Sequence, residues 1–450
     1  MRIEDSMAPV LTLDRNRVLG RIKAINGGCL APPLRGAFDI SADFQALNLP
    51  ITRLHDAPLE NAGYRLVDVN LLFPFWHLDS RDPRNYYFRD TDHYLKRCLE
   101  LGTGINYRLG TSIEQNNLGQ LLYALPPEDQ DKWIDVCEHI IAHYTEGWGD
   151  GFHHDIRYWT IYCEPDLTMG WRPPLTHDDF CQFYIKVSSR LKKRFPRLKF
   201  GGPGHGRLDI DPDGKNARFL RACAAAGAPL DFYSWNSYAM SIEYMRRQVD
   251  FARQLVTDCG YPEAEIHLSE WHYVPSSFGA CPPERQDRYF DYTLKHLDSA
   301  AYISGVLTVL QDTALDMANY YTVTATNFGL FTNRRLKTKS YYAMQAFGEI
   351  IRYPERLAIS SDNDVYALAG RNAAGEIAVL LTVLRMSGGE ITLLLDGTIG
   401  EVKHYSIDED NDLTELPLSH LEPGKIVLKI NAKPSVQLLK ISPGEMSYLK

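Results

Sequence analysis

Residues 157–167 read Arg-Tyr-Trp-Thr-Ile-Tyr-Cys-Glu-Pro-Asp-Leu, an aromatic and β-branched run that leads directly into an acid, Glu164. Such a run is typical of a buried strand. Pro165 has no N–H for a strand ladder and restricts the residue before it. The stretch therefore predicts a strand that stops at Glu164, with a carboxyl group at the strand end where parallel α/β barrels place their chemistry. The alternative is a solvated carboxyl group or a pair with Arg172.

Short apolar stretches alternate with longer amphipathic ones from about residue 18 to residue 350. The helical stretches repeat apolar residues every three to four positions, and Thr176 with Asp179 resembles a capping box before one of them. Eight strand–helix units predict an α/β fold, a (β/α)8 barrel of the TIM type. The predicted barrel strands are 18–25, 49–54, 105–109, 158–163, 198–201, 231–235, 266–269 and 305–309.

The pattern changes near Arg352, where strands follow one another without helices between them. We expect a catalytic barrel at 15–350 and a C-terminal antiparallel β-sandwich at 351–450, joined by an N-terminal strand within 1–14. The predicted strands of this second region are 365–371, 376–384, 390–395, 401–407, 425–430 and 435–441.

Composition and charge argue against a nucleic-acid-binding protein and against a membrane protein. A net charge of −9 disfavours nucleic acid, because phosphate neutralisation needs a basic surface. The chain has no apolar run long enough to cross a bilayer, and its first residues are acidic where a signal peptide is basic and then apolar. The eight cysteines are scattered, without a Cys-x-x-Cys pair. We therefore expect a cytoplasmic protein with buried thiols, no membrane or nucleic-acid partner, and a neutral or weakly charged ligand.

A second acid, Glu270, ends another apolar stretch, Glu265-Ile-His-Leu-Ser-Glu-Trp-His. It stands at the end of the seventh predicted strand, and Glu164 at the end of the fourth, so the two carboxyl groups are expected to face each other across the barrel mouth. Two carboxyl groups about 5 Å apart suit a retaining glycosidase, in which one is the nucleophile and the other the acid/base.

At this point the chain resembles glycoside hydrolase family 39, a group of retaining glycosidases with catalytic acids on the fourth and seventh barrel strands. The resemblance runs from about residue 20 to residue 347 and implies the barrel, the sandwich and a β-xylosidase-like or α-L-iduronidase-like activity. The motifs that carry it are Asn26-Gly-Gly, Arg53-Leu-His-Asp, Phe73-Pro-Phe-Trp, Tyr107-Arg-Leu-Gly, Asp231-Phe-Tyr-Ser-Trp-Asn-Ser-Tyr and Leu268-Ser-Glu-Trp.

The resemblance assigns roles by position. Glu164 matches the acid/base and Glu270 the nucleophile, and His55 matches a residue that contacts sugar hydroxyls. Arg53 is a candidate donor to the nucleophile, with a structural ion pair as its alternative. Tyr238 matches an aromatic hydroxyl beside the nucleophile, although tyrosine is also a common core residue.

Two positions depart from the family pattern. The residue before the acid/base is normally an Asn that bonds the 2-hydroxyl of the sugar, and here it is Cys163, a weak donor. The sixth strand normally carries His, and here it carries Asn236, which offers both a donor and an acceptor. Because bonds to the 2-hydroxyl strengthen in the transition state, we expect a specificity other than plain β-xyloside, or another ring form such as a furanose.

Further candidates are Gln311, at the end of the predicted eighth strand, for a sugar hydroxyl, and Trp271, after the nucleophile, for the mouth of the site or for packing under a loop. Trp76 and Trp171 are candidate stacking platforms. No metal spacing or phosphate-binding loop is evident, so we expect neither metal nor organic cofactor.

The sequence thus predicts a retaining glycoside hydrolase that acts on a glycan or oligosaccharide through a covalent glycosyl-enzyme. The alternative is a non-catalytic carbohydrate-binding protein on the same barrel. The family resemblance also suggests a homo-oligomer, without identifying an interface.

Overall fold

The structure is a computed structural model. It describes residues 8–32, 39–55, 67–111, 127–167, 170–171, 174–275, 283–362, 364–386, 388–431 and 433–444. Arg172, the alternative partner for Glu164, and Cys281 lie outside these ranges.

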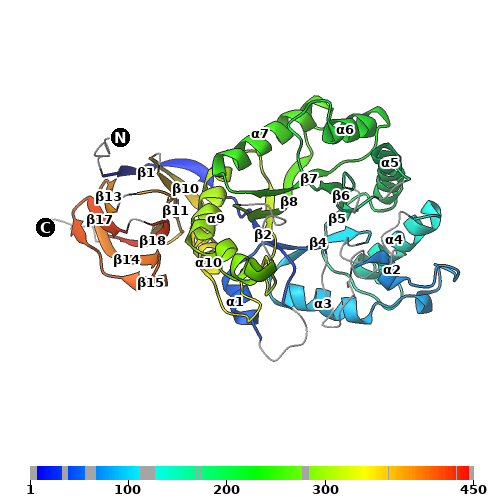
Figure 1. Ribbon diagram of the computed structural model, residues 1–450, viewed down its shortest axis with the longest axis horizontal. Helices are drawn as coiled ribbons and strands as arrows, with labels where there is room; N and C mark the ends of the chain where they lie inside the picture. The colour runs from blue at the N-terminus through cyan, green and yellow to red at the C-terminus, as the bar shows by residue number, and fades with distance from the viewer. Residues whose placement is uncertain are drawn as a thin grey trace.

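Eight parallel strands close into a barrel in chain order, with helices around the outside (Figure 1). This confirms the predicted α/β barrel. Each strand pairs in parallel with the next, and the last pairs with the first. The strands are β2 (Asn26–Cys29), β3 (Ile51–Leu54), β4 (Gly104–Leu109), β5 (Tyr158–Ile161), β6 (Lys199–His205), β7 (Phe232–Ala239), β8 (Glu265–Tyr273) and β9 (Met317–Tyr320).

The helices bury one apolar face against these strands. α5 begins at the predicted capping box, in which Thr176 and Asp179 each bond the other's backbone N–H. None of the described helices is long and apolar enough to span a bilayer. The helices are α1 (Ser41–Ala46), α2 (Val69–Leu72), α3 (Arg89–Glu100), α4 (Gln130–Thr145), α5 (His177–Arg194), α6 (Lys215–Ala225), α7 (Ile242–Asp258), α8 (Gln286–Asp291), α9 (Leu297–Val309) and α10 (Lys339–Ile350).

Two of the predicted barrel strands are wrong. Residues 305–309 belong to helix α9, which is buried on nearly every side, so its sequence is apolar all round and resembles a buried strand. The eighth barrel strand is β9, a short mixed stretch, Met-Ala-Asn-Tyr. The predicted first strand, 18–25, overlaps the end of β1 (Val10–Arg21), which lies outside the barrel, and the first barrel strand is β2.

A second, mostly antiparallel sheet of ten strands follows the barrel, as predicted, and β1 lies within it between β10 and β13. In Figure 1 the blue β1 runs among the orange strands of the C-terminal region. The six predicted strands are present, and β10, β15 and β16 are additional. The members are β10 (Glu355–Ile359), β11 (Val365–Arg371), β12 (Ile377–Val383), β13 (Gly389–Leu395), β14 (Ile399–Ile407), β15 (Asp412–Leu416), β16 (His420–Glu422), β17 (Lys425–Ile430) and β18 (Ser435–Pro443).

Strand β12 explains how the sheet is attached to the barrel. All seven of its residues are buried, because one face points into the core of the sheet and the other packs against α9 and α10. Thr382 on this outer face donates to Ser304 of α9 at 2.6 Å. The strand therefore reads as a continuous apolar run rather than an alternating one.

Candidate active site

Glu164 lies just beyond the end of β5, where the backbone turns sharply. The strand ends at Ile161, three residues earlier than predicted, and both Tyr162 and Glu164 have positive φ angles, 70° and 49°. Such values cost energy for residues other than glycine and are found where tertiary contacts impose them. The Glu164 N–H donates to the carbonyl of Gly204 on β6 at 2.9 Å. This bond between neighbouring strand ends holds the acid's backbone in place.

Glu270 lies within β8, beside a β-bulge. Trp235 of β7 pairs with Leu268, and the next residue, Asn236, pairs with Glu270, so Ser269 is an extra residue without a pairing position on β7. A bulge breaks the alternation of side chains along a strand. As a result, Ser269 and Glu270 both direct their side chains to the site.

The carboxylate of Glu270 is held by donors on both oxygens. Arg53 of β3 donates to Oε1 at 2.9 Å, and the hydroxyl of Tyr238 donates to Oε2 at 2.7 Å. Burial raises the pKa of Tyr238, and the charges of Glu270 and Glu164 raise it further, so the phenol keeps its proton. His55 lies with Nε2 at 3.7 Å from Oε1. Both oxygens of Glu270 are thus occupied by hydrogen-bond donors.

Glu164 has the opposite environment. Burial and the charge of Glu270 raise its pKa to about 8, although the Asn236 amide, which donates to Oε1 at 2.7 Å, acts against this shift. Glu164 is 8% exposed, so little water reaches its carboxyl group. At neutral pH the carboxyl group of Glu164 therefore keeps its proton.

Cys163 is fully buried beside Arg53 and His55. Its Sγ accepts from Arg53 Nη2 at 3.4 Å and lies 3.8 Å from His55 Nε2. Burial raises the pKa of its thiol well above the usual value, so the sulfur is neutral. It cannot replace an amide as a strong donor.

His55, Cys163 and Glu270 bring three metal-ligand atoms within 4.8 Å of one another. The guanidinium of Arg53 already bonds two of the three groups, Glu270 and Cys163. The guanidinium thus supplies the positive charge at this cluster.

Asn236 occupies a central place in the site. Its Nδ2 donates to Glu164 and its Oδ1 accepts from Ser269 Oγ at 2.7 Å. Sequence reasoning missed Ser269, because simple alternation along β8 places the residue before Glu270 on the other side of the strand. The bulge that overrides this alternation has no local signature in the sequence.

Two of the predicted binding residues lie elsewhere. Gln311 is in η7 (Leu310–Asp312), which precedes β9, and its amide bonds both the N–H and the carbonyl of Lys23 just before β2. It therefore lies at the amino-terminal ends of the strands, and its assignment to sugar binding is wrong. Trp271 is fully buried against Tyr302 of α9 and Tyr320 of β9, with ring centroids 6.1 and 5.1 Å away, so it packs outside the barrel rather than lining the mouth.

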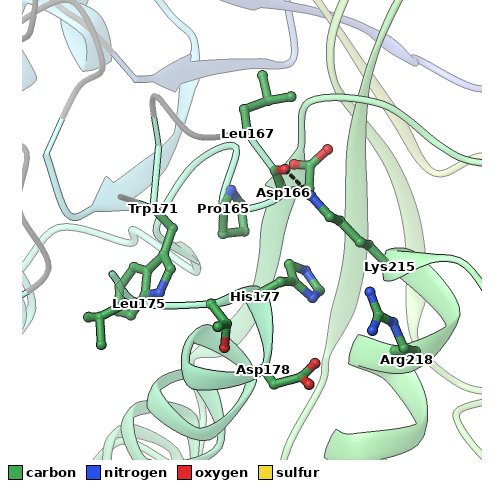
Figure 2. A pocket seen from close by; sticks show the side chains of 10 residues that line it. Pro165, Asp166, Leu167, Trp171, Leu175, His177, Asp178, Lys215 and Arg218 are labelled. Atoms are coloured by element: carbon green, nitrogen blue, oxygen red, sulfur yellow. Dashed lines mark hydrogen bonds between the residues drawn. The ribbon is translucent and has the colours of Figure 1, made fainter. Parts of the chain in front are cut away.

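A cavity of about 380 Å³ opens beside Glu164, between the loop after β5 and helix α6 (Figure 2). Trp171 forms part of its wall but is only 4% exposed, because it packs against Phe180 and Phe183. Trp76, the other candidate platform, is half-buried with its ring edge against Phe73. The cavity is lined by Pro165, Asp166, Leu167, Trp171, Leu175, Thr176, His177, Asp178, Lys215 and Arg218.

Comparison with known proteins adds to this geometry. A β-xylosidase of Geobacillus stearothermophilus is 24% identical over 301 residues, which are 59% of this chain and 54% of that protein, so the match spans about half of the relative's length. A glucosidase of Croceicoccus marinus has a similar fold, with a TM-score of 0.78 and 22% identity over 98% of this chain and all of that one. A monomeric β-xylosidase of Caulobacter crescentus superimposes with a TM-score of 0.70 and 16% identity over 97% of this chain and all of that one.

The family model of glycosyl hydrolases family 39 matches residues 46–335, well over half of the chain. This range includes Arg53, Glu164, Asn236 and Glu270. The chain belongs to glycosyl hydrolases family 39.

Proposed function

We propose that this protein is a retaining glycoside hydrolase in which Glu270 is the nucleophile and Glu164 the acid/base. The observation that carries the proposal is the opposite environment of the two carboxyl groups. Glu270 accepts from Arg53 and Tyr238, whereas burial and the Glu270 charge raise the pKa of Glu164 to about 8. Two carboxyl groups in such different surroundings can divide the nucleophile and acid roles between them.

In the first step, Glu270 attacks the anomeric carbon while Glu164 protonates the leaving oxygen. The C–O bond to the leaving group breaks, and an ester forms between the sugar and Glu270. Esterification removes the negative charge of Glu270, which is one cause of the high pKa of Glu164. The pKa of Glu164 therefore falls in the intermediate, and the same residue can now take a proton from water.

In the second step, that water attacks the anomeric carbon, breaks the ester and regenerates both carboxyl groups. His55 and Arg53 lie beside Glu270 in position to contact the sugar, and Tyr238 holds the carboxylate. Neither step requires an organic cofactor.

The substrate we propose is an uncharged glycan or oligosaccharide that differs from a plain β-xyloside. Cys163 is buried and neutral, so it does not supply the amide donor that the family uses for the 2-hydroxyl. The amide of Asn236, the other departure from the family pattern, is already bonded to Glu164 and Ser269. Both observations support weaker recognition at the second carbon of the sugar.

The experiment is a panel of aryl glycosides (β-xyloside, α-L-arabinofuranoside, β-galactoside, β-glucoside) assayed with the wild type and two variants. Glu270→Ala should be inactive on all of them. Glu164→Ala should lose about 10²- to 10⁴-fold on poor leaving groups, which need the acid in the first step. On an activated leaving group, azide should restore its turnover by replacing water in the second step, giving a glycosyl azide of retained configuration. Turnover by Glu270→Ala without added nucleophile contradicts the assignment, and an azide of inverted configuration contradicts retention.

The competing function is a non-catalytic carbohydrate-binding protein. Sugar binding without turnover on any substrate of the panel would support it. A buried carboxyl group with a raised pKa is costly, and binding alone does not require it.

We further propose that the protein acts in the cytoplasm. All seven cysteines within the described ranges are free thiols, and six of them are buried. Mass analysis under non-reducing conditions, on the protein purified from its native host, tests whether the cysteines are free thiols.

We also propose that the protein self-associates. Analytical sedimentation would measure its oligomeric state.

A further inference from the structure

A hydroxyl group stands behind the amide that contacts the acid/base. Ser269 Oγ donates to Asn236 Oδ1 at 2.7 Å, and Asn236 Nδ2 donates to Glu164 Oε1 at 2.7 Å. The three residues are 2%, 1% and 8% exposed. The two short bonds therefore form a continuous chain of hydrogen bonds that is shielded from solvent.

This chain of hydrogen bonds has a direction, because the Asn236 amide donates through its nitrogen and accepts through its oxygen. If the amide were turned over, its Nδ2 would donate to Ser269 Oγ, and the hydroxyl hydrogen would lose Asn236 Oδ1 as its acceptor. The amide oxygen would then face Glu164, which is unfavourable in the glycosyl-enzyme, where Glu164 is the ionised general base. The hydroxyl therefore favours the orientation in which the amide N–H faces the acid.

We propose that Ser269 is a positioning residue for the acid/base step. It fixes the Asn236 amide, which occupies Oε1 of Glu164 with a donor, and this leaves Oε2 as the oxygen that carries the catalytic proton. The proposal rests on the function proposed above and adds a residue and a proton position to it.

The bulge in β8 is what makes this arrangement available. Ser269 is the unpaired residue between Leu268 and Glu270, so two consecutive side chains of β8 reach the site. One holds Asn236, and the other is the proposed nucleophile. Bulges beside active sites commonly redirect a side chain in this way.

The test is Ser269→Ala, compared with the wild type on one sugar bearing a series of leaving groups. Protonation matters for a poor leaving group and little for dinitrophenolate. The variant should lose about five- to tenfold in kcat/KM on the poor leaving groups, the ratio that corresponds to one hydrogen bond, and about twofold or less on the dinitrophenyl glycoside.

The pH profile supplies a readout that a structural role would not move. The N–H of Asn236 favours the ionised form of Glu164, so loss of its fixed orientation raises the pKa of Glu164. The alkaline limb of kcat/KM should therefore move to higher pH in Ser269→Ala. A matched control is Ser304→Ala, which removes another buried hydroxyl at the junction of α9 and β12 and should leave the limb in place.

A double-mutant cycle shows whether Ser269 acts through the amide. Once Asn236→Ala has removed the amide, adding Ser269→Ala should cost no further activity. Losses that multiply, or an unmoved alkaline limb in Ser269→Ala, would overturn the proposal. A wild type that is inactive on every glycoside would instead contradict the proposed function, so the two failures are distinguishable.

Discussion

Tyr238 donates its phenolic hydrogen to Oε2 of Glu270 at 2.7 Å, on the oxygen that Arg53 leaves open. Tyr238 and Glu270 lie on neighbouring strands, β7 and β8, and are brought together by the register of that pair. The carboxylate is thus fixed through both oxygens before substrate binds. Donors that are in place before the reaction stabilise negative charge without any rearrangement during it.

Removing this phenolic hydroxyl tests its contribution. Tyr238→Phe should lower kcat by about 10- to 100-fold, because a hydrogen bond to a charged group is worth about 1.5–3 kcal/mol. Steady-state kinetics on the best glycoside of the panel measure the change. The control is Tyr302→Phe, since the Tyr302 hydroxyl is buried but has no hydrogen-bond partner among the described residues, and its loss should leave kcat unchanged. Equal kinetics for the two variants would contradict the role of Tyr238.

The pKa of Glu164 predicts the alkaline side of the pH profile. With a pKa raised to about 8, Glu164 is protonated at neutral pH, and kcat/KM should fall as pH rises through about 8. The fall should be smaller for a dinitrophenyl glycoside, which needs no proton at its leaving oxygen. A limb that begins below pH 6 would show that Glu164 does not carry the proton in the free enzyme.

The same pKa makes a prediction about stability. Because the folded pKa is raised from 4.5 to about 8, the stability associated with the protonated group is complete below pH 4.5 and is lost as pH rises through 8. Glu164→Gln should therefore be more stable than the wild type at pH 9, by an amount on the order of a few kcal/mol, and the difference should shrink toward pH 5. Chemical denaturation at several pH values measures it. Glu390→Gln, on the exposed surface of β13, should show no such dependence.

Cys163→Asn tests the origin of specificity. The amide restores the donor that the family uses for the 2-hydroxyl, so the ratio of kcat/KM for β-xyloside to that for the best substrate should rise by roughly tenfold, equivalent to about 1.4 kcal/mol. Cys163→Ser, which keeps the size of the side chain, should change the ratio little. If the asparagine variant folds and shows an unchanged ratio, recognition at the second carbon does not depend on this position.

Trp271→Ala separates packing from sugar binding. The ring is fully buried against Tyr302 and Tyr320, so its loss should lower the free energy of unfolding by about 3–5 kcal/mol. KM should remain unchanged at temperatures well below the midpoint of unfolding. A large increase in KM with little loss of stability would show that Trp271 contributes to sugar binding.

Much of the fold could be predicted from the sequence because its signals are local. Apolar runs with polar ends marked six barrel strands, and Thr176 with Asp179 marked the start of α5. The signal failed where burial was complete, since α9 is apolar on every side and reads like a strand. That error also misplaced Gln311, which was assigned to the end of a strand that does not exist there.

For the site, the sequence by itself predicted where the two acids lie, because a parallel barrel brings the carboxyl ends of its strands to one face. Only the tertiary structure decided their surroundings. Arg53, Tyr238 and Asn236 come from three points of the chain, and their partners depend on strand register. Ser269 depends on a bulge in that register. The pKa of Glu164 is likewise a tertiary property, because burial and the nearby charge of Glu270 arise only when the barrel closes.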